Sequence, residues 1–196
     1  PSGYKVEILG VRHAASMAAG YQQAMEASNA KYKIYLHQDV FVINSRLISN
    51  LLDIFQIDAK IGMIGLAGAA KLRQDKPAWW ISEPSTLFGT CYTRLSENEM
   101  VRHYYGEVPG GSGAYVSVAA IDGLFMATQY DLSWRADLLH GWHFYDISKS
   151  REFINAGYKV VIPYQQEPWV IHDCGRKELG ENFYDSMTIF KDNYRW

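Results

Sequence analysis

The sequence predicts an α/β protein with a mostly parallel central sheet flanked by helices. Strand-like and helix-like segments alternate over the first 66 residues, and this order is typical of parallel strands joined by helical crossovers. The wholly apolar run Ile61–Leu66 is typical of a central strand that is covered on both faces. With 48% hydrophobic and 14% aromatic residues among 196, the chain can bury a substantial core.

Hydrophobic periodicity predicts the helices and strands of the first third of the chain. KVEILGV alternates apolar and polar residues, as a strand does, whereas Met17, Tyr21 and Met25 recur on one helical face. Ser45 is the expected N-cap of the next helix. In order, we expect a strand over Lys5–Val11, a helix over Ala14–Ser28, a strand over Tyr32–Leu36, a helix over Ser45–Phe55 and a strand over Ile61–Leu66.

The remainder is less regular until Tyr115. We expect loops and a hairpin over residues 67–113, and a helix after Asp146 that stops at Gly157. The sequence shows no repeat and no linker, so residues 1–196 are expected to form a single domain. The further elements expected are a strand over Tyr115–Ile121, a helix over Ser133–Leu139, a helix over Asp146–Ala156, a strand over Tyr158–Ile162, a strand from Trp169 and a final helix.

Charge and cysteine content exclude several classes of function. The 19 basic and 21 acidic residues give a net charge of −2 without a basic run, so no nucleic-acid partner is expected. The charge-free stretches Ile61–Ala70 and Gly110–Ile121 are too short to span a membrane. Two cysteines are too few for a disulfide framework and no signal peptide is visible, so a reduced, cytoplasmic setting is expected.

Three carboxylates follow predicted strands, where ligands bind in open α/β sheets. Asp39 could hold Mg²⁺ or Mn²⁺ on a diphosphate, or it could simply cap the next turn. Asp122 and Gly123 could form a plain turn, or meet a substrate hydroxyl with the backbone close by. Asp146 could act as a general base behind an aromatic run that stacks on sugars, or it could cap a helix beside a core cluster.

His172 is a candidate second ligand beside Asp39, although a lone histidine is more often structural.

Fingerprints of other enzyme classes are missing from the sequence. There is no G-x-G-x-x-G after a strand, no phosphate loop ending in Gly-Lys-Ser/Thr, no G-x-S-x-G elbow and no metal-type cysteine spacing.

Five motifs in order carry a family resemblance: YLHQDVFV from Tyr35, IDGLFMAT from Ile121, GWHFYDIS from Gly141, AGYKVVIP from Ala156 and WVIHDCG from Trp169. The chain resembles, from about Tyr4 to Gly175, a glycosyltransferase-like family related to glycosyltransferase family 2, which has a member in streptomycin biosynthesis. The resemblance implies a GT-A-like, Rossmann-like nucleotide-diphospho-sugar transferase fold.

The resemblance also implies residue roles. His37-Gln38-Asp39 occupies the place of the family's D-x-D motif, so Asp39 inherits the metal role and His37 is a lesser candidate. His172 lies where some relatives carry a third metal ligand. Asp146 inherits the role of catalytic base, and Tyr145 replaces the usual Glu before it. The implied substrate-binding residues are Arg12 and Ser16 near the nucleotide and, near sugar and acceptor, Asp122, Gly123, Trp142, His143 and Tyr145.

One departure from the family concerns the N-terminus. Relatives begin with an earlier strand and helix, and Lys5–Val11 looks like their second strand, so the fold is expected to be N-terminally incomplete. An exposed flank of the sheet would lower stability or favour a homodimer.

The resemblance implies a glycosyltransferase that moves a sugar from a nucleotide-diphosphate donor to an acceptor hydroxyl of a saccharide or other molecule, with inversion and the help of divalent Mn or Mg. The alternative is a non-catalytic GT-A-like module that binds a sugar or a partner, favoured by the incomplete D-x-D motif. A nucleotidyltransferase is less favoured, because the sequence has no Gly-rich basic phosphate loop after its first strand.

Overall fold

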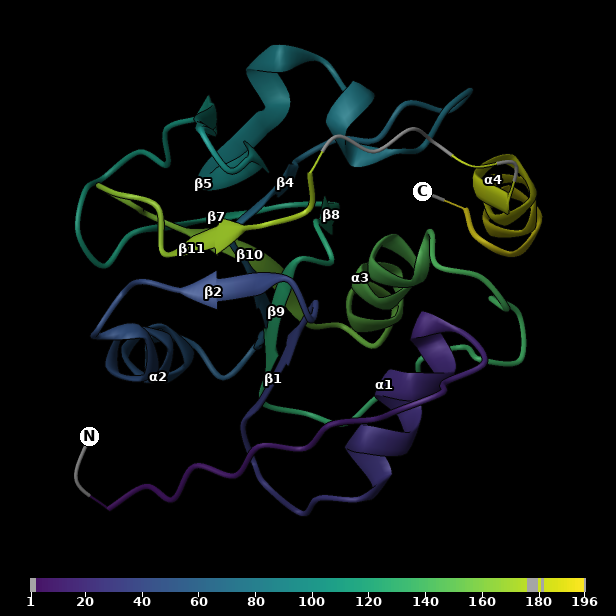
Figure 1. Cartoon of the computed structure of the whole chain (residues 1–196), viewed down its shortest axis with the longest axis horizontal. Helices are drawn as coiled ribbons and strands as arrows, with labels where there is room; N and C mark the ends of the chain where they lie inside the picture. Colours follow the sequence, from purple (N-terminus) through teal and green to yellow (C-terminus); the bar gives the residue numbers. More distant parts are fainter. Residues whose placement is uncertain (1–2, 176–179, 181, 196) are drawn as a thin grey trace.

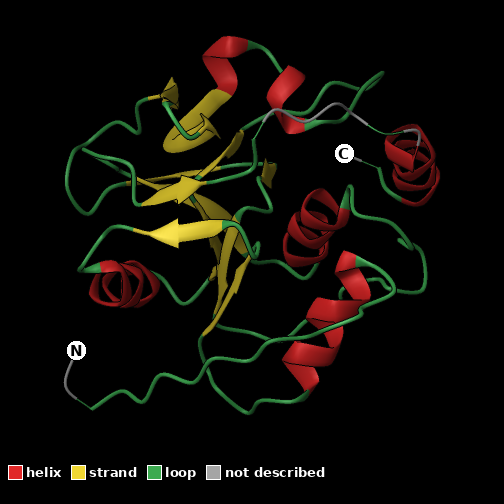
Figure 2. Cartoon of the chain, viewed as in Figure 1, coloured by secondary structure: helices red, strands yellow, loops and turns green. Residues whose placement is uncertain are grey.

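The structure is a computed structural model, which describes residues 3–175, 180 and 182–195. Within this part of the chain, two mixed β-sheets lie at the centre and helices lie to their sides (Figures 1 and 2). The first sheet has the strand order β1 (Lys33–Leu36), β9 (Phe125–Thr128), β3 (Ile61–Gly65), β10 (Lys159–Pro163) and β7 (Tyr115–Ser117).

The second sheet lies beside the first. Its order is β2 (Val40–Val42), β11 (Val170–His172), β5 (Leu87–Ser96), β4 (Ala67–Ala69) and β8 (Ala120–Ile121), with β6 (Glu99–Gly106) paired to β5. The β5–β6 pair is the hairpin expected between residues 67 and 113, and two short 3₁₀ turns, Trp79–Ile81 and Pro84–Thr86, precede it.

Helices cover both faces of the first sheet. Because side chains alternate along a strand, Ile64 packs toward α2 (Leu47–Ile57) in one apolar cluster, while its neighbour Met63 belongs to the opposite cluster. That opposite cluster includes residues of α1 (Met17–Glu26), α3 (Tyr145–Asn155) and α4 (Asn182–Asn193). Figure 1 shows α2 on one side of the strands and the other three helices on the opposite side.

The expectation of a mostly parallel sheet is wrong. Only β3–β10 and β5–β11 are parallel among the described pairings, and the others are antiparallel. The main cause is β9, which inserts antiparallel between β1 and β3 after the chain turns at Asp122 and Gly123. Its predecessor β8 pairs with β4 in the second sheet, so β9 enters the first sheet from the second sheet and runs against both of its neighbours there.

The predicted strand Lys5–Val11 is also absent. The segment has no regular structure, and the side chains of Val6 and Ile8 are exposed. Alternation alone cannot make a strand, because a strand needs a partner for its backbone hydrogen bonds, and no described segment pairs with this one. Figure 1 shows it as an extended arm outside the sheets, and the Tyr4 ring lies 6.4 Å from that of Tyr32.

Three smaller expectations need correction. Ser133–Leu139 is not a helix, because Arg135 has a left-handed φ of 51° and only a turn follows. Tyr115–Ile121 divides into β7 and β8, which belong to different sheets. The N-cap of α2 is Arg46 rather than Ser45. The helix that ends before Gly157 is confirmed, and that glycine has a φ of 85°.

Candidate functional site

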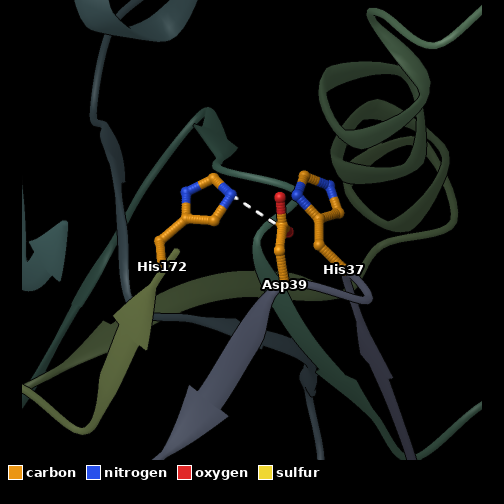
Figure 3. Close-up of side chains that lie close together, drawn as sticks. All are labelled: His37, Asp39 and His172. Atoms are coloured by element: carbon orange, nitrogen blue, oxygen red, sulfur yellow. Dashed lines mark ion pairs between the residues drawn. The ribbon is translucent and has the colours of Figure 1, made fainter. Parts of the chain in front are cut away.

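Three strand ends bring His37, Asp39 and His172 together. His37 follows β1, Asp39 precedes β2, and His172 ends β11. The antiparallel β2–β11 ladder pairs His172 with Val40, and the Asp173 amide donates a hydrogen bond of 2.8 Å to the Asp39 carbonyl just beyond it. Figure 3 shows the three side chains directed toward one another. The ladder register therefore positions Asp39 and His172, which the sequence predicted as partners.

The donor atoms of this cluster suit a divalent cation. One ligand atom from each residue lies within 4.8 Å of the others, and His172 Nε2 lies 3.3 Å from Asp39 Oδ1. All three residues are half-buried, which leaves room for a further ligand from solution. Two imidazole nitrogens and one carboxylate form the donor set of many open transition-metal sites. The chemistry of these three donor groups therefore fits a divalent metal ion.

The remaining ring nitrogen of His37 is engaged by α3. The hydroxyl of Tyr145, at the first residue of α3, contacts His37 Nε2. Tyr145 is buried, and its pKa is raised well above 10 by burial and then by the negative charges of Asp146, Asp122 and Asp39. Asp39 precedes β2 and Asp122 follows β8, whereas Asp146 lies in the first turn of α3 and not at the end of a strand as predicted. The contact between Tyr145 and His37 places this first turn of α3 beside the cluster.

Asp146 sits at the start of α3 with its carboxylate held by two backbone amides. The Gly123 amide donates to Oδ2 and the Ile147 amide donates to Oδ1, both at 2.9 Å. Burial, and secondarily the charge of Asp122, raises the pKa of Asp146 to about 7. A carboxylate with this pKa can take up a proton near neutral pH, as a general base must.

Gly123 is required by close packing against α3. A Cβ atom there would lie 2.0 Å from the Tyr145 hydroxyl, so any side chain would displace Tyr145. Asp122 accepts a hydrogen bond of 2.7 Å from the Leu124 amide, as a turn residue does. These contacts are those of a turn, and the turn also supports Asp146 through the Gly123 amide.

An aromatic cluster surrounds Phe183 of α4. The Phe183 ring lies 5.6 Å from Trp80, 5.4 Å from His143 and 5.3 Å from Phe144. Phe183 is buried, whereas Trp80 and Tyr184 have exposed side chains, as does Trp142 just before His143. Trp80 and Tyr184 were not among the predicted site residues, and the adjacent pair Trp79-Trp80 is the feature of the sequence that could have indicated Trp80.

The two residues predicted to contact the nucleotide lie near the start of α1, and they differ in exposure. Arg12 is exposed in the irregular segment before the helix, while Ser16 is buried and its hydroxyl caps α1 by accepting from the Ala19 amide at 3.1 Å. The Tyr21 hydroxyl is buried without a hydrogen-bond partner among the described residues. Burial and then the charges of Asp146 and Asp39 raise the pKa of Tyr21.

Comparison with known proteins defines the class to which this fold and site belong. A model described as "Glycosyltransferase like family" matches residues 1–194. The chain therefore belongs to this glycosyltransferase-like family, as the five sequence motifs indicated, and this membership supports a general glycosyltransferase role. No curated protein matches the chain.

Among the residues that the structure describes, no helix has both the length and the apolar character needed to cross a bilayer.

Proposed function

We propose that this protein is a GT-A-type glycosyltransferase that moves a sugar from a nucleotide-diphosphate donor to an acceptor hydroxyl. The observation that carries the proposal is the contact between the Tyr145 hydroxyl and His37 Nε2. It joins the residue before Asp146, whose pKa is raised to about 7, to the His37–Asp39–His172 cluster. A candidate base and a candidate cation site thereby lie within one region of the fold.

The proposed reaction is a single displacement that inverts the anomeric centre. Asp146 takes the proton of the acceptor hydroxyl while the acceptor oxygen forms a bond to the anomeric carbon. The bond between that carbon and the donor's phosphate oxygen breaks, and the nucleoside diphosphate leaves with the electron pair. A divalent cation bound beside the diphosphate supplies charge neutralisation for the leaving group.

His37, Asp39 and His172 are the residues proposed to hold the cation. Mg²⁺ prefers an octahedral set of oxygen ligands, whereas imidazole nitrogens suit transition metals. With two histidines and one carboxylate, the set favours Mn²⁺ over Mg²⁺ as the ion bound here. Arg12 and Ser16 are proposed near the nucleotide. On the acceptor side, the proposed residues are Asp122, Gly123, Trp142, His143 and Tyr145.

Nucleotide binding tests the proposal directly. We expect UDP or GDP with Mn²⁺ to raise the thermal stability of the protein, because a ligand at 100 times its Kd adds about 2.7 kcal/mol to a folded state that binds it. Transfer from a panel of nucleotide sugars to saccharide acceptors is then measured by release of the nucleoside diphosphate. Absence of any nucleotide-dependent shift, together with absence of released diphosphate, contradicts the proposal.

Replacement of Trp142 by alanine is expected to weaken acceptor binding. Aromatic contacts contribute roughly 0.5–1.5 kcal/mol beyond area burial, so we expect the acceptor KM to rise roughly 2- to 10-fold with little change in donor KM. The matched control is Tyr104→Ala, because Tyr104 is another exposed aromatic residue but lies on β6. Equal effects of the two variants would exclude a specific role for Trp142.

A non-catalytic sugar-binding module is the second candidate. It is favoured by the exposed rings of Trp80, Trp142 and Tyr184, which could bind saccharide without a cation. The two candidates differ in their response to loss of the Asp146 carboxylate, because a binding module has no turnover to lose.

A further inference from the structure

We propose that Tyr145 is a positioning residue that fixes the tautomer and ring orientation of His37, so that Nδ1 of His37 is the atom offered to the cation. This inference rests on the proposed cation site. It concerns a residue that departs from the family's usual Glu, so a role cannot be carried over from relatives.

The first step is the geometry of the His37 ring. Its Nε2 atom is engaged by the Tyr145 hydroxyl, while its other ring nitrogen, Nδ1, lies on the side of Asp39 (Figure 3). The His37 and His172 rings are 5.5 Å apart by their centroids. The two nitrogens of His37 therefore point in different directions, one toward α3 and one toward the cluster.

The second step is the chemistry of imidazole. A neutral imidazole carries one N–H and one lone pair, and only the lone pair can bind a metal ion. If the Tyr145 oxygen accepts a hydrogen bond from the Nε2–H of His37, the lone pair is placed on Nδ1. Metal-binding histidines generally donate their second N–H to a partner of this kind, which fixes both tautomer and orientation.

The third step is the rigidity of the tyrosine. Tyr145 is 3% exposed, and Gly123 lies so close to its hydroxyl that a Cβ atom there would clash at 2.0 Å. Its ring also meets the ring of Tyr21 at a centroid distance of 5.9 Å. The hydroxyl is thus held by packing from a turn and two helices, so the partner of His37 Nε2 is fixed before any ligand arrives.

The test is Tyr145→Phe, which keeps the ring and removes only the hydroxyl. Mn²⁺ affinity is measured without nucleotide by electron paramagnetic resonance, and the His37 tautomer by ¹⁵N NMR of the imidazole nitrogens. We expect roughly 10- to 100-fold weaker Mn²⁺ binding, the usual effect of losing such a partner, and loss of a unique Nε2–H tautomer at His37. Unchanged affinity with an unchanged tautomer would overturn the proposal.

Tyr35→Phe is the matched control, because Tyr35 is a buried tyrosine of the same aromatic group, with its ring 5.2 Å from that of Tyr21. Equal loss of Mn²⁺ binding in both variants would indicate a packing effect and overturn the proposal. If Tyr145→Phe does not fold, the tautomer of His37 in the wild-type protein tests the inference. A His37 that carries its proton on Nδ1 would contradict it. Mn²⁺ binding through His37 without sugar transfer would refute the proposed function and leave this inference standing.

Discussion

Asp39→Asn is expected to reduce Mn²⁺ affinity by at least about 100-fold, because loss of a direct ligand should exceed the 10- to 100-fold loss typical of supporting residues. Asparagine keeps the size of the side chain but removes the single negative charge that this cluster contributes. Mn²⁺-dependent binding of UDP or GDP is expected to fall with it, since a cation held by this cluster would neutralise the charge of the diphosphate. Calorimetric titration of Mn²⁺, with and without nucleotide, measures both effects.

Asp173→Asn is the matched control for this prediction. Asp173 directly follows His172, yet its carboxylate pairs with Arg94 at 3.0 Å instead of joining the cluster. Its backbone amide still supports Asp39 in the variant, so the β2–β11 register is preserved. If Asp173→Asn and Asp39→Asn weaken Mn²⁺ equally, the effect is general surface charge and the proposed ligand role of Asp39 is wrong.

The elements that could be predicted from the sequence are those with a strong local pattern. β3 is a continuous apolar run, and α3 has helical spacing with a glycine stop at Gly157. Lys5–Val11 has an equally clear alternation but no strand structure, because pairing depends on a partner elsewhere in the chain. The mixed sheet was missed for a related reason, since β9 takes its place between β1 and β3 through long-range pairing.

The candidate site could likewise be predicted from the sequence only in part. Asp39 and His172 could be proposed together because each follows or ends a strand-like segment, and their proximity is confirmed. The contact between His37 and Tyr145 joins residues 108 positions apart and depends on how α3 packs on the sheets, which no local pattern encodes. Tyr21 is similar, because its spacing in α1 is equally compatible with ordinary helix packing.

Asp146→Asn is expected to lower turnover by roughly 10²- to 10⁴-fold, the usual contribution of a positioned general base, with nucleotide and Mn²⁺ affinity largely retained. An amide cannot take the acceptor proton, and its shape is close to that of the carboxylate. Steady-state release of nucleoside diphosphate measures turnover. Asp53→Asn, an exposed position on α2 across the first sheet, is the control. Retained turnover in Asp146→Asn would rule out Asp146 as the base.

The pH dependence of the same carboxylate gives an independent check. Burial, with the charge of Asp122, raises the pKa of Asp146 from 3.8 to about 7 in the folded protein, so the folded state holds a proton that the unfolded state releases between these values. The raised pKa therefore leaves the free energy of unfolding unchanged below about pH 4. It lowers that free energy progressively from about pH 4 to pH 7, and by the full amount above pH 7.

The contribution of Asp146 is accordingly expected to make wild-type stability decline as the pH rises across this window. Turnover is expected to change in the opposite sense, falling as the pH drops below about 7, because the base becomes protonated. Urea unfolding of wild type and Asp146→Asn at several pH values isolates the contribution, because groups common to both proteins cancel in the difference. The asparagine variant should show the shallower decline. Parallel stability curves would mean that the Asp146 carboxyl titrates near its ordinary value, and the predicted fall of turnover below about pH 7 would then be wrong.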